Sequence, residues 1–230
     1  LINKGILIEN SDTKFEISDI SIKNYRDYGL KLVNVKNGLI RNFQVSWGLI
    51  IASGIYLLNS ENIIIESGEI NRNNGDGLIL RRSNNNTIKD LSINQNDNGI
   101  FLFKSDSNLL IDNFIHYNSK NGIYFSDSKN NQIIDCEINH NLHSGIYMYY
   151  RSSGNLIINN EIFDNSYIPQ YKSYPAIYIR YYSNNVKILD NDISNHNNWG
   201  VDVYSSDNIE ICNNNIHFNT GGIQLYTDIN

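Results

Sequence analysis

The sequence has few of the residues that build disulfide scaffolds, basic surfaces or membrane spans. It holds two cysteines, two prolines and one methionine in 230 residues, and no apolar run approaches the ~20 residues that cross a bilayer. Its formal net charge of −6 argues against nucleic acid as a partner, because phosphate binding needs a basic surface. Cys136 and Cys212 lie three repeats apart, too far to bond at strand spacing, which leaves them as small core or turn residues.

A repeat runs through the whole chain. It is marked by a glycine that precedes an apolar residue, and one alanine replaces it: Gly5, Gly29, Gly54, Gly77, Gly99, Gly122, Gly145, Ala176, Gly200 and Gly222. The spacings are 24, 25, 23, 22, 23, 23, 31, 24 and 22 residues. A fixed period in this range is typical of a solenoid.

Within each repeat, apolar residues alternate with outward ones, as in Ile123 and Phe125 or Ile146 and Met148. Alternation predicts strands with one buried face, and the Asn, Asp, Ser and Gly between them predict turns. We therefore expect an all-β, single-domain parallel β-helix over residues 1–230, with about nine to ten coils of 22–25 residues. Asparagines recur at matching places and predict stacked amide columns: Asn73, Asn96, Asn118, Asn141, Asn165 and Asn219 in one, Asn113, Asn160, Asn191 and Asn214 in another.

The unit from Gly122 to Asn141 resembles the right-handed parallel β-helix repeats (PbH1 type) of the NosD-like, carbohydrate-binding and sugar-hydrolase group. The resemblance covers essentially the whole chain. It implies a right-handed solenoid and a secreted or cell-surface protein. The group includes polysaccharide lyases, hydrolases, uronan epimerases, a periplasmic copper-enzyme maturation protein and surface proteins. The sequence contains no Gly-His-Gly or Asp-Pro-His-Asp signature of its enzymes and no His/Met/Cys cluster with metal-ligand spacing, so we expect no metal site of that kind.

Outward positions after the glycine form a candidate binding face. Aromatic rings stack on the apolar faces of sugars, and Arg pairs with carboxylates or sulfates. The candidate substrate-binding residues on this face are Tyr124, Tyr147, Tyr149, Tyr178, Arg180, Asp202 and Tyr204. Because aromatic residues also favour strands for structural reasons, the same strip is equally explained as a packing face.

The one long spacing contains an insertion at about residues 166–175. It holds both prolines and adds Tyr171 and Lys172 to the candidate binding residues. Loops that depart from a rigid repeat often carry function, and we expect this one to wall a groove beside Tyr147 and Arg180. The alternative is a tolerated insertion without a role.

A second outward column holds three carboxylates, Glu137, Glu161 and Asp192, on consecutive coils. Like charges at strand spacing raise each other's pKa, and paired carboxylates are what glycoside hydrolysis needs. They are the candidate catalytic residues. Two other interpretations are a Ca²⁺ site that includes Asp135 and Asp190, and a solvated acidic edge.

Two classes of function remain open. In the first, the chain is an extracellular protein that binds a polysaccharide or surface glycan along its aromatic face, with lyase, epimerase or hydrolase activity if it is an enzyme. In the second, it is a non-catalytic, adhesin-type structural module whose aromatic face is a protein interface. Exposed coil ends invite edge pairing, so self-association or flanking domains are expected.

Overall fold

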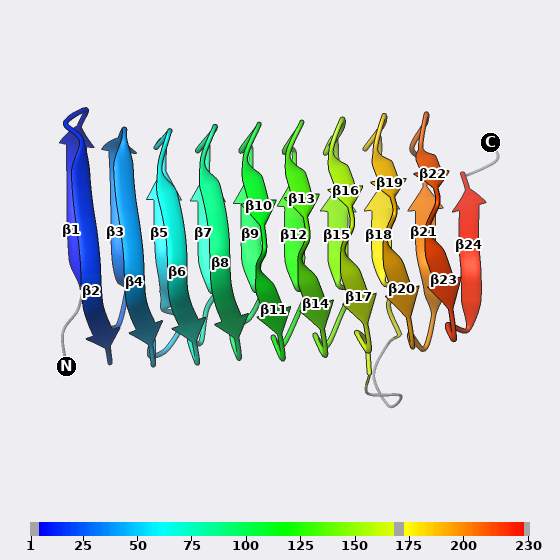
Figure 1. Ribbon diagram of the computed structural model, residues 1–230, viewed down its shortest axis with the longest axis horizontal. Helices are drawn as coiled ribbons and strands as arrows, with labels where there is room; N and C mark the ends of the chain where they lie inside the picture. The colour runs from blue at the N-terminus through cyan, green and yellow to red at the C-terminus, as the bar shows by residue number, and fades with distance from the viewer. Residues whose placement is uncertain (1–4, 168–172, 228–230) are drawn as a thin grey trace.

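The computed structural model describes residues 5–167 and 173–227 and is a right-handed parallel β-helix (Figure 1). In Figure 1 the front strands run downward, the back strands run upward, and successive coils advance from left to right, which gives the right-handed turn. All 24 elements of the described residues are strands, and no helix able to span a bilayer occurs among those residues.

Each coil contributes one strand to a ten-stranded parallel sheet. Its strands are β1 (Ile6–Ser11), β3 (Tyr28–Val35), β5 (Ser53–Leu58), β7 (Leu78–Arg81), β9 (Ile100–Phe103), β12 (Ile123–Ser126), β15 (Ile146–Tyr149), β18 (Ile177–Arg180), β21 (Trp199–Tyr204) and β24 (Gly221–Tyr226). The register joins equivalent residues, for example Ile123 to Ile146. The predicted coil number and repeat length are confirmed.

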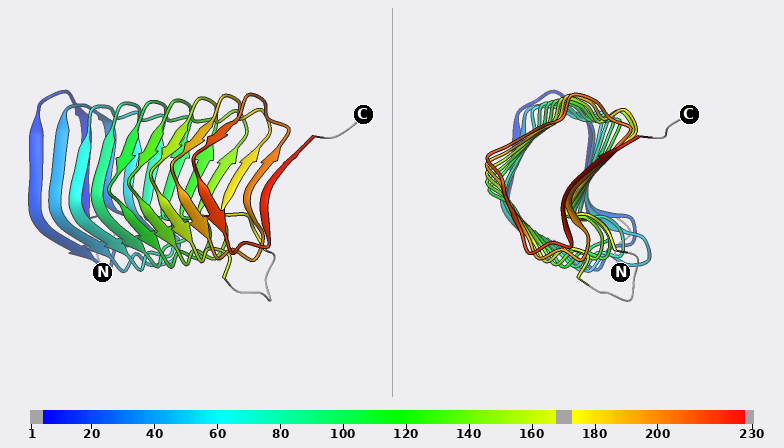
Figure 2. Two further views of the ribbon diagram at one scale, coloured as in Figure 1. Left: turned by 45° about the vertical axis from the view of Figure 1, so that its right-hand side comes forward. Right: turned by 90° about the vertical axis from the view of Figure 1, so that its right-hand side faces the viewer.

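The opposite side of the solenoid is a fourteen-stranded sheet, and Figure 2 shows the two walls around one elongated core. Four long strands begin it: β2 (Phe15–Lys23), β4 (Gly38–Ser46), β6 (Ile64–Asn71) and β8 (Thr87–Asn94). Paired short strands continue it: β10 (Leu109–Ile111) and β11 (Phe114–His116), β13 (Gln132–Ile134) and β14 (Glu137–Asn139), β16 (Leu156–Ile158) and β17 (Glu161–Phe163), β19 (Lys187–Leu189) and β20 (Asp192–Ser194), β22 (Glu210–Cys212) and β23 (Asn215–His217).

The change from long to paired strands follows from one position in the repeat. A residue with positive φ, such as Asp90 (51°) or Asp112 (54°), bends the strand in every coil. In the early coils an apolar or glycine residue follows it, as Leu91 does, and the strand continues. From Asn113 onward the next residue is an Asn or Cys, buried in every coil up to Asn191, whose polar side chain bonds the neighbouring coil in place of the strand ladder. Asn113 Oδ1, for example, accepts from the Leu91 backbone N–H at 3.1 Å.

The predicted amide columns are present inside the turns. In one column, Asn118 Nδ2 donates to Asn141 Oδ1 at 2.9 Å, and Asn141 Nδ2 donates to Asn165 Oδ1 at 2.9 Å. An Asn amide can donate to one neighbour and accept from the other, so a column of buried amides satisfies itself. The glycine opposite is required by space: a Cβ on Gly122 would lie 2.6 Å from Ile138 Cγ2 and 2.9 Å from Asn141 Nδ2.

One coil differs from the others in both the asparagine column and the glycine column. His196 occupies the column position between Asn165 and Asn219, and Ala176 takes the place of the glycine in the same coil. His196 is 2% exposed. Its Nε2 lies 3.3 Å from Asn165 Nδ2 and its Nδ1 lies 3.0 Å from Asn219 Oδ1. A neutral imidazole protonated at Nδ1 fits both contacts, because Nδ1 then donates and Nε2 accepts.

We expect His196 to make the fold acid-sensitive. Burial lowers the pKa of His196 from 6.5 to about 4, so the folded state holds fewer protons than the unfolded chain between these values. The free energy of unfolding has its full value above pH 6.5, where the ring is neutral in both states. It decreases as the pH falls toward 4, and the total decrease is on the order of 3 kcal/mol. The double variant His196→Asn/Ala176→Gly restores the repeat and should lose this dependence.

The measurement is the free energy of urea unfolding for both proteins at pH 7.5, 6 and 5. The difference between double variant and wild type should grow in favour of the variant as the pH falls. A difference that stays constant over this range would contradict the assignment of acid sensitivity to His196.

Candidate functional site

The aromatic face lies on the ten-stranded sheet and contains a ladder of stacked rings. Phe101, Tyr124, Tyr147 and Tyr178 occupy successive rungs of β9, β12, β15 and β18. Their ring centroids are 4.9, 5.3 and 5.2 Å apart in order, with interplanar angles of 8°, 16° and 19°. We call these four residues the ring ladder.

The ring ladder changes the expected mode of sugar binding. Each inner ring has both faces against its neighbours, so those faces are not free to stack on a sugar. The ladder instead presents ring edges and the hydroxyls of Tyr124, Tyr147 and Tyr178, at a spacing close to one coil. The ladder has two ends: the Phe101 face toward β7 has no ring against it in this column, whereas the outer face of Tyr178 carries the Arg180 guanidinium.

Arg180 lies beside the second of these ends, held among aromatic rings. Its guanidinium carbon is 5.0 Å from the ring centroid of Tyr178, 4.6 Å from that of Tyr181 and 5.1 Å from that of Tyr204. Its Nη2 donates to the Tyr181 hydroxyl at 2.8 Å. Burial raises the pKa of Tyr147 to about 12 against the opposing Arg180 charge. Tyr147 is therefore a neutral hydroxyl at pH 7, able to donate and accept.

Asp202 follows Tyr178 in the same outward column and is 6% exposed. Burial raises the pKa of its carboxyl from 3.8 to about 6, although the Arg180 charge lowers it. Asp202 Oδ1 and Arg180 Nε are both buried, and neither has a hydrogen-bond partner within residues 5–167 and 173–227. Unpartnered buried polar atoms are costly, and two on adjacent strands mark a polar site at this end of the ring ladder.

The remaining predicted binding residues divide into two groups. Tyr149 packs edge-on against Tyr181 at 5.5 Å, and Tyr181 packs edge-on against Tyr204 at 5.2 Å. Sequence reasoning missed Tyr181, which follows the strand in a turn and gives no alternation signal. Tyr171 and Lys172 lie outside the described residues.

The described ends of the insertion contact two histidines at the edge of the coils. Tyr174 stacks on His143 at 4.3 Å, and the Tyr167 ring is 5.8 Å from that of His140. Both histidines follow β14 in the turn before β15. The predicted groove wall beside Tyr147 and Arg180 depends on the part of the insertion that lies outside the described residues, and it stays a prediction.

The three predicted catalytic carboxylates lie on the other sheet. Glu137, Glu161 and Asp192 are in register on β14, β17 and β20, and they line one hollow of about 390 Å³ together with Asp135 and Asp190. Burial, followed by the Glu161 charge, raises the pKa of Glu137. Asp192 Oδ1 lies 2.9 Å from His217 Nε2.

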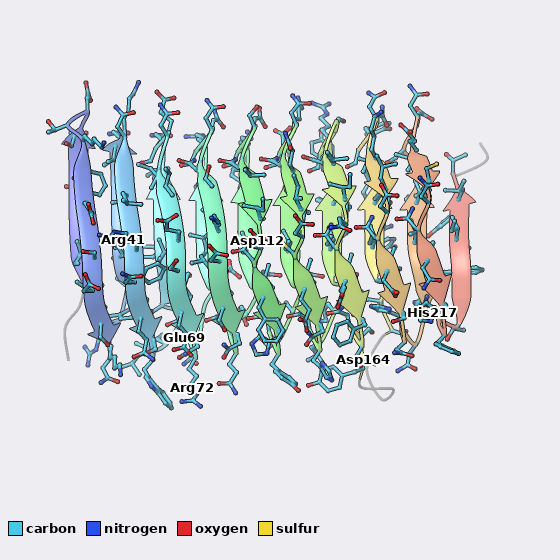
Figure 3. All side chains as sticks on the ribbon, in the orientation of Figure 1. Arg41, Glu69, Arg72, Asp112, Asp164 and His217 are labelled. Carbon is cyan, nitrogen blue, oxygen red and sulfur yellow. The ribbon has the colours of Figure 1, made fainter. Side chains whose placement is uncertain are left out.

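The carboxylate hollow and the aromatic face point away from each other. Figure 3 views the molecule from the side of the fourteen-stranded sheet, with Glu69, Asp112 and His217 labelled on it, while the ring ladder belongs to the sheet behind. One sugar unit therefore cannot contact both sites. The sequence placed both sets correctly on outward columns, but the two columns serve separate surfaces.

The fold and its columns define a right-handed parallel β-helix protein. A family model described as "Periplasmic copper-binding protein (NosD)" matches residues 1–178, more than half of the chain, and the chain belongs to the NosD family. No curated protein sequence matches the chain.

Solved structures share the fold at low sequence identity. The A-module of mannuronan C-5 epimerase AlgE6 from Azotobacter vinelandii superposes with a TM-score of 0.73 at 16% identity, over 96% of this chain and 71% of that one. The surface protein and adhesin PfbA of Streptococcus pneumoniae gives 0.75 at 15%, over 96% and 68%. The periplasmic alginate epimerase AlgG gives 0.66 at 13%, over 99% and 78%. Such likeness shows the fold alone.

The described residues do not fit a copper site, although the family description names that metal. No three His, Cys, Asp or Glu side chains within 5–167 and 173–227 are placed to hold an ion. Two of the three soft ligands are unsuited as well: Met148 and Cys136 are buried in the coil interior, and burial raises the pKa of Cys136 to about 11, which disfavours the thiolate that metals bind. The third, Cys212, is exposed and belongs to no metal-binding group of side chains in the described residues. The calcium site at the carboxylate hollow stays a prediction.

Asp202→Asn should stabilise the protein at neutral pH. The raised pKa of Asp202 means that the folded state favours the protonated form, so stability is lost as the pH rises from about 4 to 6 and stays lost above it. At pH 7 the neutral variant should unfold with a free energy higher by roughly 1–2 kcal/mol, because solvent screening reduces the effect of the pKa shift, and the two proteins should converge toward pH 4. Urea unfolding at pH 7 and 4.5 measures both; an equal shift at the two pH values would argue against a buried carboxylate.

Proposed function

We propose that the chain is an exported polysaccharide-binding β-helix protein that holds an acidic glycan along the outer face of its ten-stranded sheet. The observation that carries the proposal is the end of the ring ladder, where Arg180 Nε and Asp202 Oδ1 are buried without partners beside the Tyr147 and Tyr178 rings. The Arg180 and Tyr178 side chains around these atoms are only partly buried, so a glycan carboxylate can pair with the accessible part of the guanidinium and a glycan hydroxyl can bond to the Tyr178 hydroxyl.

The coil spacing suits an extended polymer. Each coil advances by about 4.8 Å, close to the length of one sugar in an extended chain, and the ring ladder offers one tyrosine hydroxyl per coil from Tyr124 to Tyr178. Consecutive sugars can therefore meet equivalent groups. Arg180 provides the fixed cation that a uronate or sulfate needs.

Neighbouring folds and the family are compatible with this proposal. The solved structures include enzymes named for mannuronan and alginate and a surface adhesin, and the family is described as periplasmic. These names set a periplasmic or surface location and a uronate polymer as the first candidates to test.

The carboxylate hollow is not part of the proposed glycan site. It gathers five carboxylates, which would repel an acidic polymer, and it faces the opposite side of the solenoid. Hydrolysis at Glu137, Glu161 and Asp192 would require a neutral glycan bound to that other face, and the product assay below tests for it.

A panel of mannuronan, galacturonan, a sulfated glycan and a neutral glucan tests the proposal by calorimetry. Arg180→Gln should weaken binding to the acidic polymer at least tenfold, because a charge-assisted hydrogen bond contributes roughly 1.5–3 kcal/mol. Arg41→Gln is the matched control: Arg41 carries the same charge on the opposite sheet and pairs with Glu16 at 2.7 Å, so binding should be unchanged.

Product release is followed in the same samples through unsaturated-uronate absorbance and reducing ends. A released product would make the protein an enzyme and name its reaction. Failure of well-folded wild type to bind any of the polymers would contradict the proposal and leave the aromatic face as a contact surface between proteins.

A further inference from the structure

The outward column that contains the ring ladder is interrupted at a second position, on the side of the ladder away from Asp202. In the outward column that contains the ring ladder, Tyr56, Ile79 and Phe101 occupy three successive coils. Ile79 is aliphatic between two aromatic neighbours, and a hollow of about 390 Å³ lies over it. We call this hollow the Ile79 notch.

The Ile79 notch has the dimensions of a missing ring. Tyr56 and Phe101 are two coil steps apart, or roughly 10 Å, and ring pairs in this column stack at 4.9–5.3 Å. One ring inserted above Ile79 would sit at stacking distance from Phe101, which is half-buried, and would be bounded on the other side by Tyr56, which is 7% exposed. Phe101 ends the ring ladder, so its face toward the notch has no aromatic partner in this column, while Tyr56 stacks on Tyr28 at 4.6 Å.

One cation lines the notch, and two more lie against aromatic rings of its lining. Arg81, next to Ile79 in the lining, lies 5.5 Å from the Phe103 ring, and Lys104 lies 5.4 Å from the same ring. Lys31 lies 5.4 Å from the Tyr56 ring on the other side. Each of these cations is a potential partner for an anionic ligand group.

A carboxylate also lines the notch and provides a polar contact of the opposite kind. Asp76 Oδ1 accepts from the Asn98 backbone N–H at 2.9 Å and from Asn98 Nδ2 at 2.8 Å. Both bonds end on the same oxygen, so the carboxylate is fixed in place by its neighbour while its second oxygen takes no part in them. Fixed acceptors of this kind orient the hydroxyls of sugar rings.

We infer that the Ile79 notch is a subsite that holds one uronate ring of an acidic polysaccharide between Tyr56 and Phe101. Arg81 pairs with the uronate carboxylate and Asp76 accepts from a ring hydroxyl. This inference rests on the proposed function and extends it, because Ile79 and Tyr178 are four coils apart in the same column. That separation of about 19 Å means that a ligand reaching both ends of the ring ladder needs roughly five sugar units.

The test fills the notch with the ring that the column lacks. Ile79→Tyr continues the ladder and should leave the fold intact, while it occupies the place of the sugar. Against hexamers of mannuronate and of galacturonate in calorimetry, we expect affinity to fall about tenfold, because the new ring takes both the space above Ile79 and the stacking face of Phe101. Ser92→Tyr adds the same ring to an outward position of β8 on the opposite sheet and should stay within twofold of wild type.

Arg81→Gln tests the charge without changing the shape of the notch. It should weaken uronate hexamers about tenfold and leave the affinity for cellohexaose unchanged. Arg82→Gln is the matched control, because Arg82 is the adjacent exposed arginine and does not line the notch. This pair keeps the inference testable if Ile79→Tyr fails to fold.

The outcomes separate the subsite from the wider function. If Arg180→Gln weakens the hexamers while Ile79→Tyr and Arg81→Gln bind as wild type does, the polysaccharide function stands and the subsite is overturned. If wild type binds cellohexaose as tightly as the uronates, the uronate assignment is overturned. If wild type binds no polymer and no hexamer, both proposals fall.

Discussion

Every residue of this solenoid must be compatible with its own counterpart one coil above and one coil below. Parallel pairing in register places equivalent residues about 4.8 Å apart, from Ile123 over Ile146 to Ile177 in the core. Apolar residues tolerate this stacking by packing, and Asn amides tolerate it by donating and accepting at once. Stacked carboxylates repel one another instead: burial, followed by the charge of Glu161 one coil away, raises the pKa of Glu137.

The same constraint makes exceptions informative. A column of like residues is explained by stability, so a residue that breaks its column requires another reason. His196 breaks an amide column and brings Ala176 with it in the same coil. Ile79 breaks an aromatic column and leaves a hollow, and Asp202 ends that column with a buried carboxylate. The candidate functional sites of this chain are therefore interruptions of the repeat rather than extensions of it.

The sequence predicts the fold well because the repeat multiplies each weak signal. A single alternation such as Ile123 and Phe125 is ambiguous, but its recurrence at nearly constant spacing excludes helices and sets the register. The outward columns follow from the same recurrence, including the aromatic face and the carboxylates. The orientation of the rings could not be predicted, because side-chain torsions decide whether a tyrosine shows its face or its edge, and no sequence pattern encodes those torsions.

Unpartnered atoms were equally invisible in the sequence. That Arg180 lies among Tyr178, Tyr181 and Tyr204 depends on a turn residue that alternation does not select. The Ile79 notch carries a signal that could have been used: an aliphatic residue between Tyr56 and Phe101 in an aromatic column. This signal can be interpreted only when the spacing of the rings is known, because the smaller Ile79 side chain leaves a hollow between neighbours that are two coils apart.

The two outer faces also differ in charge, which affects how an acidic polymer would approach. Carboxylates gather on the fourteen-stranded sheet at the hollow that contains Glu137 and Asp190, whereas Lys31, Arg81 and Arg180 lie among the rings of the ten-stranded sheet. An anionic chain is repelled by the first surface and attracted by the second, and such fields act over about 10 Å at 0.1 M salt. A solenoid that is acidic overall can thus favour an acidic ligand locally, because the carboxylate hollow and the cations among the rings lie on opposite sides.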